Sequence, residues 1–150
     1  MPHTFTNLLA HIIFSTKDRV PHIDVELKPH LFAYMGGIVR EQKGKAWKIN
    51  GTTDHVHLLI SLPPAISISE AMRVVKTNSS RWVHDEWPSH KAFGWQTGYG
   101  AFSVSQSNLM AVSKYIENQE EHHKKIFFQQ ELITYLKKHD IAYDERYIWE

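Results

Sequence analysis

The segment Asp54-His55-Val56-His57-Leu58-Leu59-Ile60 lies near the middle of a 150-residue chain and predicts the centre of its fold. Its apolar residues are typical of a buried strand, and successive side chains of a strand alternate between the two faces of a sheet. His55 and His57 therefore share one face, whereas Val56 and Leu58 face the core. Two imidazoles on one face can bind one divalent ion. Because the chain has 11 histidines, an isolated pair can equally be ordinary strand residues, so the other segments must decide.

The composition is that of a globular protein. Hydrophobic residues make up 42% and charged residues 22% of a length that suits one domain with a sizeable core. There is no cysteine, so disulfides and thiolate metal sites are excluded. The 17 Lys and Arg against 16 Asp and Glu leave a net charge of +1. A nucleic-acid partner would therefore require basic residues that are concentrated locally.

Nothing in the sequence predicts a membrane segment. The longest apolar stretches, Leu8–Phe14 and Val56–Ile68, are short or carry His and Pro. The start Met-Pro-His-Thr lacks a basic segment followed by an apolar one, so no signal peptide is expected. We expect a cytoplasmic protein.

Strand and helix patterns alternate along the rest of the chain. Besides the histidine strand, strands are expected at Leu8–Ser15, Ala46–Gly51 and Trp95–Val104. Helices are expected from Asp24 to Lys43, from Ser67 or Ser69 to a point before Pro88, from the Ser105–Asn108 cap region, and over Gln129–His139. The order predicts an α+β fold of the ferredoxin-like, split βαβ type, with two helices on one face of an antiparallel sheet and appended C-terminal helices. This arrangement leaves the other face free for a site and places the histidine strand centrally.

A second group of polar residues follows in the helix after Ser105. It contains Tyr115-Ile116-Glu117-Asn118-Gln119, and residues four apart on a helix project from the same face. The side chains of Tyr115 and Gln119 can therefore reach the same site. Taken alone, Tyr115 would be the edge of an apolar stripe with its hydroxyl in water.

Together the two groups resemble the active site of single-tyrosine HUH transposases of the insertion-sequence 200/605 group. The resemblance covers nearly the whole chain. Its matching segments are His11–Lys17, Asp54–Ile60, Gly100–Ser105 and Tyr115–His123. It implies one transposase domain over residues 1–150, with 126–150 as a C-terminal helical extension.

The resemblance also implies a reaction. Tyr115 would attack a phosphodiester of single-stranded DNA, leaving a 5′-phosphotyrosine bond and a free 3′-hydroxyl. A 3′-hydroxyl from another DNA end could then attack that bond and rejoin strands without ATP. The resemblance makes His55, His57 and Gln119 the ligands of Mg²⁺ or Mn²⁺, which would act as a Lewis acid.

The expected partners follow from the same resemblance. The substrate would be single-stranded DNA with hairpins near the element ends. The protein would be a homodimer in which the tyrosine helix of one subunit completes the histidine site of the other. Candidate DNA contacts are Lys17, Arg19, Lys76 and Arg81.

Alternatives from other classes remain open. A noncatalytic nucleic-acid-binding module could use the same sheet, although such modules carry aromatic residues where this chain has histidines. A domesticated endonuclease acting on repeated palindromes would keep the same site residues. Trp47, Trp95 and Tyr99 could stack on bases, although core positions are the simpler interpretation.

Other polar residues near this motif have no predicted role. We place His122 on the surface by default, although it could be an extra ligand or a general acid or base. Tyr135, Tyr143 and Tyr147 are rival phenols, but none has a glutamine four residues later.

Overall fold

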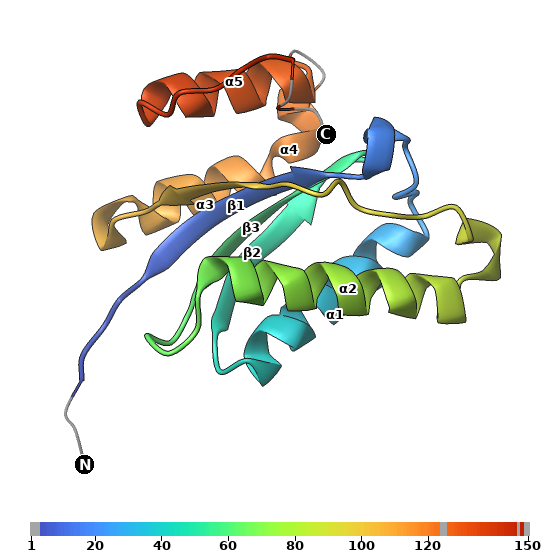
Figure 1. Cartoon of the computed structure of the whole chain (residues 1–150), viewed down its shortest axis with the longest axis horizontal. Coiled ribbons are helices and arrows are strands. Elements are labelled where there is room, and N and C mark those ends of the chain that lie inside the picture. The colour runs from blue at the N-terminus through green and yellow to red at the C-terminus, as the bar shows by residue number, and fades with distance from the viewer. Residues whose placement is uncertain (1–3, 124–125, 147, 149–150) are drawn as a thin grey trace.

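In the computed structural model, which describes residues 4–123, 126–146 and 148, four antiparallel strands form one sheet (Figure 1). The strands are β1 (Leu9–Ser15), β2 (Lys45–Gly51), β3 (His55–Ser61) and β4 (Gly100–Ser103). Their order is β2-β3-β1-β4, so β3 and β1 are central. This is the predicted ferredoxin-like α+β arrangement, with the histidine strand in the middle of the sheet.

Two long helices, α1 (Leu27–Glu41) and α2 (Ile68–Glu86), cover one face of this sheet (Figure 1). The main core lies between them and the strands. Val56, Leu58 and Ile60 of β3 are fully buried in it, as the alternation of the histidine strand predicts. Complete burial of such a side chain contributes about 2 kcal/mol, so this face fixes the register of β3 and with it the direction of the histidines.

The helix starts follow local capping. Helix α1 begins at Leu27, three residues after the expected start, and the Asp24 carboxylate accepts a hydrogen bond from the Leu27 N–H at 2.8 Å. At α2 the Ser67 hydroxyl accepts from the Glu70 N–H at 3.1 Å, which settles the cap as Ser67 rather than Ser69. Short 3₁₀ helices occupy Lys17–Arg19, Pro88–His90 and Gln106–Asn108.

Strand β4 is shorter than the expected Trp95–Val104. Trp95 forms only an isolated bridge to Thr16, and Gln96 pairs with Ser15 partly through its side chain, whose Oε1 accepts the Ser15 N–H. The Lys76 ammonium donates to the carbonyl of Gln96 at 3.0 Å and to that of Gly98 at 2.5 Å. These side-chain contacts replace the strand ladder, so regular pairing starts only at Gly100.

The second face of the sheet is covered, contrary to the prediction that it is free. Helices α3 (Leu109–Glu117), α4 (Gln119–His123) and α5 (Phe128–Lys138) lie over it (Figure 1). Two apolar clusters hold them there. One contains Leu9, Leu59, Leu109 and Ile116, and the other contains Ile13, Phe102, Phe128, Leu132 and Leu136. The histidines of β3 are therefore enclosed between the sheet and these helices.

The described part of the chain contains no helix that is long and apolar enough to cross a membrane. Of the rival phenols, Tyr147 lies outside the described residues, whereas Tyr143 packs against the apolar cluster that contains Phe128, Leu132 and Leu136.

Candidate metal and nucleophile site

The two histidines of β3 point to the same side of the sheet, as predicted, and both are fully buried. His57 Nδ1 lies 2.8 Å from Nε2 of His11 on the neighbouring strand β1. Burial lowers the pKa of His57 to about 4 and that of His11 to about 3. Both rings are consequently neutral near pH 7, the form in which imidazole binds metals.

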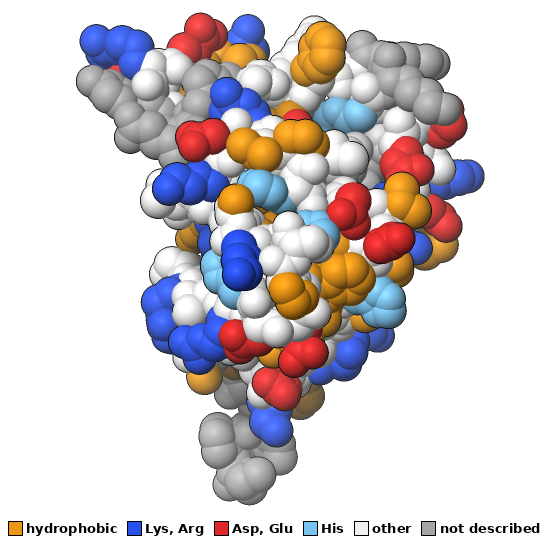
Figure 2. Space-filling model, turned by 90° about the vertical axis from the view of Figure 1, so that its right-hand side faces the viewer, with side chains coloured by type: hydrophobic (Ala, Val, Ile, Leu, Met, Phe, Trp, Pro, Cys, Tyr) orange, Lys and Arg blue, Asp and Glu red, His pale blue; other side chains and the backbone are white. Residues whose placement is uncertain are grey.

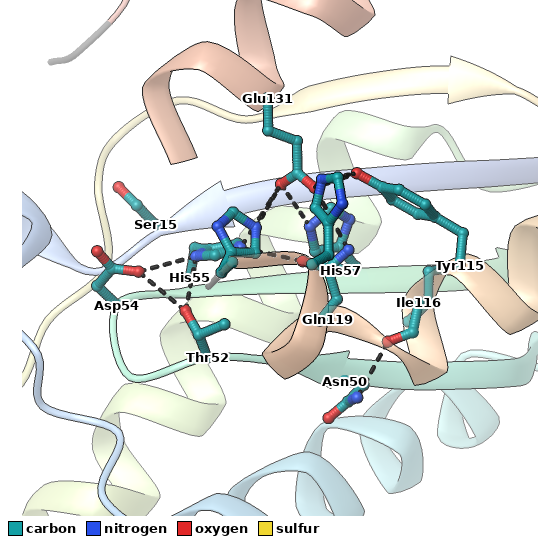
Figure 3. A network of polar contacts seen from close by, with 12 residues as sticks. Ser15, Asn50, Thr52, Asp54, His55, His57, Tyr115, Ile116, Gln119 and Glu131 are labelled. Atoms are coloured by element: carbon teal, nitrogen blue, oxygen red, sulfur yellow. Dashed lines mark hydrogen bonds and ion pairs between the residues drawn. The ribbon is translucent and has the colours of Figure 1, made fainter. Parts of the chain in front are cut away.

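The proton position on His55 follows from its neighbours. His55 Nδ1 lies 2.8 Å from the Asp54 carboxylate and 2.9 Å from the Thr52 hydroxyl (Figure 3). Burial alone would raise the pKa of Asp54, but the hydrogen bond from His55 holds it below the ordinary value. An ionised carboxylate only accepts, so Nδ1 carries a proton, and in the neutral ring Nε2 is the nitrogen that can bind a metal. This carboxylate–histidine arrangement is typical of metal-binding histidines.

Tyr115 and Gln119 lie on two helices rather than on the single predicted helix. Asn118 has φ −95° and ψ 21°, which ends α3, and Gln119 begins α4. The Asn50 amide, on β2, donates to the carbonyl of Ile116 at 3.0 Å (Figure 3). It also donates to the carbonyl of Glu117 at 3.1 Å and thereby caps the end of α3. The break still brings the two side chains to the histidines. Gln119 is fully buried, with Oε1 3.3 Å from His55 Nε2.

The phenol of Tyr115 points from α3 toward the same centre (Figure 3). Its ring centroid lies 5.9 Å from that of His57, and its hydroxyl lies 3.0 Å from His122 Nε2 and donates to the Glu131 carboxylate. Burial, and then the negative charge of Glu131, raise the pKa of Tyr115 above its usual value. The phenol is therefore protonated near neutral pH and needs a proton acceptor before it can act as a nucleophile.

Glu131 is the main site residue that the sequence analysis missed. It projects from α5 and is 2% exposed. Its partners among the described residues are His57 at 2.9 Å, His123 at 3.1 Å, His122 at 3.2 Å, Gln119 at 3.3 Å and Tyr115. Burial alone would raise the pKa of Glu131, but the hydrogen bonds from His123 and His57 outweigh burial and hold it well below its usual range. A carboxylate within the apolar stripe of Phe128 and Leu132 was the available signal.

His122 differs from its predicted surface position. It is half-buried and contacts Tyr115 and Glu131. His123, its neighbour, stacks edge-on against His55 with ring centroids 4.3 Å apart. Both histidines face the site because α4 starts a new helical path after Asn118, a turn that a continuous helix would not make.

The residues present fit a divalent cation. In the neutral ring, His55 Nε2 would carry a lone pair, yet it faces the carbonyl oxygen of Gln119, which only accepts. Flipping the Gln119 amide would turn its carbonyl oxygen toward the Glu131 carboxylate and repeat the conflict there. A positive ion between these atoms would resolve both contacts. His55, His57, His123 and Glu131 place one ligand atom each within 4.8 Å of one another.

A cavity of about 230 Å³ reaches the nucleophile. Tyr115, His122 and Glu131 line it, together with Tyr135 and Lys138 of α5. Tyr115 is thus accessible from outside although it is half-buried.

The predicted DNA contacts are distributed over the molecule. Lys17 and Arg81 are exposed, whereas Lys76 is half-buried and donates to backbone carbonyls. Burial lowers the pKa of Lys76 to about 8. On the face drawn in Figure 2, acidic and basic side chains are interspersed. This face therefore has no patch formed by basic side chains alone.

The aromatic candidates divide between core and surface. Trp95 packs in the core against Phe14 and donates its Nε1–H to the Ser79 hydroxyl at 2.9 Å, as its core interpretation requires. Trp47 and Tyr99 are each 38% exposed. Stacking on bases remains a prediction for these two alone.

Comparison with known proteins supports the resemblance at the level of sequence. A family profile described as "Transposase IS200 like" matches residues 4–119. The transposase for insertion sequence element IS200 of Salmonella typhimurium is 25% identical over 130 residues, covering 83% of this chain and 84% of that protein. The ISDra2 transposase TnpA of Deinococcus radiodurans is 27% identical over 114 residues, covering 73% of this chain and 81% of that protein.

Solved structures show the same fold. A transposase structure from Deinococcus radiodurans has a TM-score of 0.64 at 23% identity, covering 79% of this chain and 95% of that one. The structure of a REP-associated tyrosine transposase bound to a REP hairpin has a TM-score of 0.61 at 13% identity, covering 96% of this chain and 90% of that one.

Proposed function

Since this chain belongs to the IS200-like transposase family, we propose that it cleaves and rejoins single-stranded DNA at hairpin-bearing ends, with Tyr115 as the nucleophile. The observation that carries the proposal is the position of Tyr115. Tyr115 lines a cavity, and its ring lies 5.9 Å from that of His57. A phenol beside a metal-binding group is suited to attack on a phosphodiester.

The proposed reaction has two steps, cleavage of the DNA by Tyr115 and rejoining of the DNA strands. The Tyr115 oxygen bonds to phosphorus while the bond from phosphorus to the 3′-oxygen breaks, and the departing 3′-oxygen takes a proton from water. The phenolic proton leaves along the hydrogen bond to His122 Nε2. An incoming 3′-hydroxyl then attacks the phosphotyrosine, which restores the phenol and rejoins the DNA.

His55, His57 and Gln119 would hold Mg²⁺ or Mn²⁺. When bound, the ion supplies positive charge to the phosphate oxygens. The Asp54 and Thr52 contacts orient His55, and His11 orients His57, so both rings are held in place before substrate arrives.

We also propose that hairpin DNA is bound through Lys17, Arg19, Lys76 and Arg81. A relative of the same fold has been solved with a REP hairpin, which supports this class of ligand. A domesticated endonuclease acting on repeated palindromes is the second candidate, because the likeness to that REP-associated protein extends over nearly the whole chain. Palindromes that closely bracket the gene would support a mobile element, and solitary palindromes scattered through the genome would support the domesticated enzyme.

We propose further that the protein forms a homodimer whose sites are completed in trans. Within one chain Tyr115 lies beside its own His57. Mixing Tyr115→Phe subunits with His57→Ala subunits separates the two arrangements. Cleavage by the mixture would support the trans arrangement, whereas an inactive mixture would show that each chain uses its own tyrosine.

The central test is covalent capture of labelled single-stranded hairpin DNA taken from the flanks of the gene. The full chain is incubated with and without Mn²⁺, and the products are separated on a denaturing gel. We expect a protein–DNA adduct that requires metal, is lost in Tyr115→Phe and persists in Tyr34→Phe, a change on the far side of the sheet. DNA that is retarded but never cleaved would instead indicate a binding module.

A further inference from the structure

We propose that Glu131 and His123 are also ligands of the ion, so that helix α5 contributes a metal ligand to a site otherwise built on β3 and α4. The inference rests on the metal site of the proposed function. It adds two ligands from the segment that follows the Tyr115–Gln119 motif, and it gives the C-terminal region a definite role.

The distances around Glu131 match the edges of a coordination polyhedron. Its Oε1 lies 2.9 Å from His57 Nε2, 3.1 Å from His123 Nε2 and 3.6 Å from His55 Nε2. With metal–ligand bonds of about 2.1 Å, neighbouring ligand atoms are about 3.0 Å apart in an octahedron and about 3.4 Å apart in a tetrahedron. The contacts of Glu131 therefore have about the lengths of ligand–ligand edges, and the four ligand atoms all lie within 4.8 Å of one another.

The outer nitrogens of the β3 histidines already have partners. His55 Nδ1 contacts Asp54, and His57 Nδ1 contacts His11, so in each ring Nε2 is the atom that faces Glu131. Metal-binding histidines have this pattern, in which the second nitrogen is held by a carboxylate or another acceptor.

The packing of α5 fixes Glu131 in a buried position, where a nearby positive charge would stabilise its carboxylate. Phe128 and Leu132, on either side of it in α5, are buried against Ile13 and Phe102 of the sheet. The described residues offer its carboxylate imidazoles, a phenol and an amide as partners. A buried carboxylate is costly without a cation, and a divalent ion would supply that charge.

The chemical class of the ion follows from the ligand set. Three imidazoles, one carboxylate and the Gln119 amide suit first-row ions such as Mn²⁺ and Zn²⁺ better than Mg²⁺, which prefers oxygen ligands and keeps its water. Metal binding would join α5 to β3 and stabilise the packing of α5 against the sheet.

The test is metal binding by the full chain after removal of metal with a chelator. Mn²⁺, Zn²⁺ and Mg²⁺ are titrated calorimetrically into the wild type, Glu131→Gln, His123→Gln and the matched control Glu117→Gln, which changes an exposed carboxylate at the end of α3. We expect one ion per chain, with at least tenfold weaker binding of Mn²⁺ and Zn²⁺ in the first two variants and unchanged binding in the control. Circular dichroism of the apo variants establishes that they are folded.

Hydrogen exchange locates the ion. Mn²⁺ should slow amide exchange across Phe128–Lys138 in the wild type but not in Glu131→Gln. Wild-type affinity in Glu131→Gln would overturn the inference while leaving the proposed function to the adduct assay. A wild type that binds no metal would also overturn it. Metal binding through Glu131 without any DNA adduct would overturn the proposed function alone.

Discussion

Asn50 provides a sensitive test of how α3 is positioned over the sheet. Its side-chain amide donates to the carbonyls of Ile116 and Glu117 in the last turn of the helix, where the regular helical hydrogen bonds end. Each such bond contributes about 1 kcal/mol net, so Asn50→Ala should lower the free energy of unfolding by about 2 kcal/mol. For a chain of this length that corresponds to a fall of about 6 °C in Tm.

Asn50→Asp should cost more than Asn50→Ala. The carboxylate would face two carbonyl oxygens at the negative end of the α3 dipole, which adds about 1 kcal/mol. Urea unfolding followed by circular dichroism measures both variants. Asn108→Ala is the matched control, because Asn108 lies at the other end of α3 and its side chain makes no cap hydrogen bond.

Asn50→Ala and Asn50→Asp should also slow covalent adduct formation, because Tyr115 and Gln119 flank the end of α3 that Asn50 holds. The adduct rate is measured in a single turnover at saturating DNA, under conditions in which each variant is fully folded. Equal stability of Asn50→Ala and Asn108→Ala, or an Asn50→Asp variant more stable than Asn50→Ala, would refute the reasoning.

Three further perturbations follow from individual contacts. A Cβ on Gly51 would lie 2.1 Å from the backbone oxygen of His55, so Gly51→Ala should destabilise the fold by about 2 kcal/mol or more in urea unfolding. Gly37→Ala, whose Cβ would meet only an arginine side-chain nitrogen at 3.8 Å within α1, should instead stabilise it by about 0.5–1 kcal/mol; the opposite order would contradict the packing described. Because burial lowers the pKa of Lys76 from 10.5 to about 8, the unfolded chain binds more protons between these values. Stability relative to Lys76→Met should therefore rise between pH 8 and 10.5, and a flat difference would contradict the burial of this ammonium. Arg81→Ala should weaken hairpin binding and reduce the slope of log affinity against log salt by about 1, measured by fluorescence anisotropy; an unchanged slope would remove Arg81 from the DNA surface.

Local patterns were sufficient for the main lines of the fold. The alternation of β3 predicted which residues enter the core, and the element order predicted the sheet topology, because both depend on periodicities that each segment carries by itself. The extent of β4 was not predictable in this way. It depends on Gln96 and Lys76, whose side chains satisfy backbone groups that a strand pattern assigns to the ladder.

The sequence by itself determined that His55 and His57 share a face, that Tyr115 and Gln119 lie near each other, and that the chain resembles one transposase family. Only the tertiary structure placed Glu131 and His123 at the same centre, covered the second face of the sheet and ended α3 at Asn118. The physical reason is distance along the chain. Strand and helix periods fix the relation of residues a few positions apart, whereas the meeting of α5 with β3 depends on the apolar surfaces that pack between them.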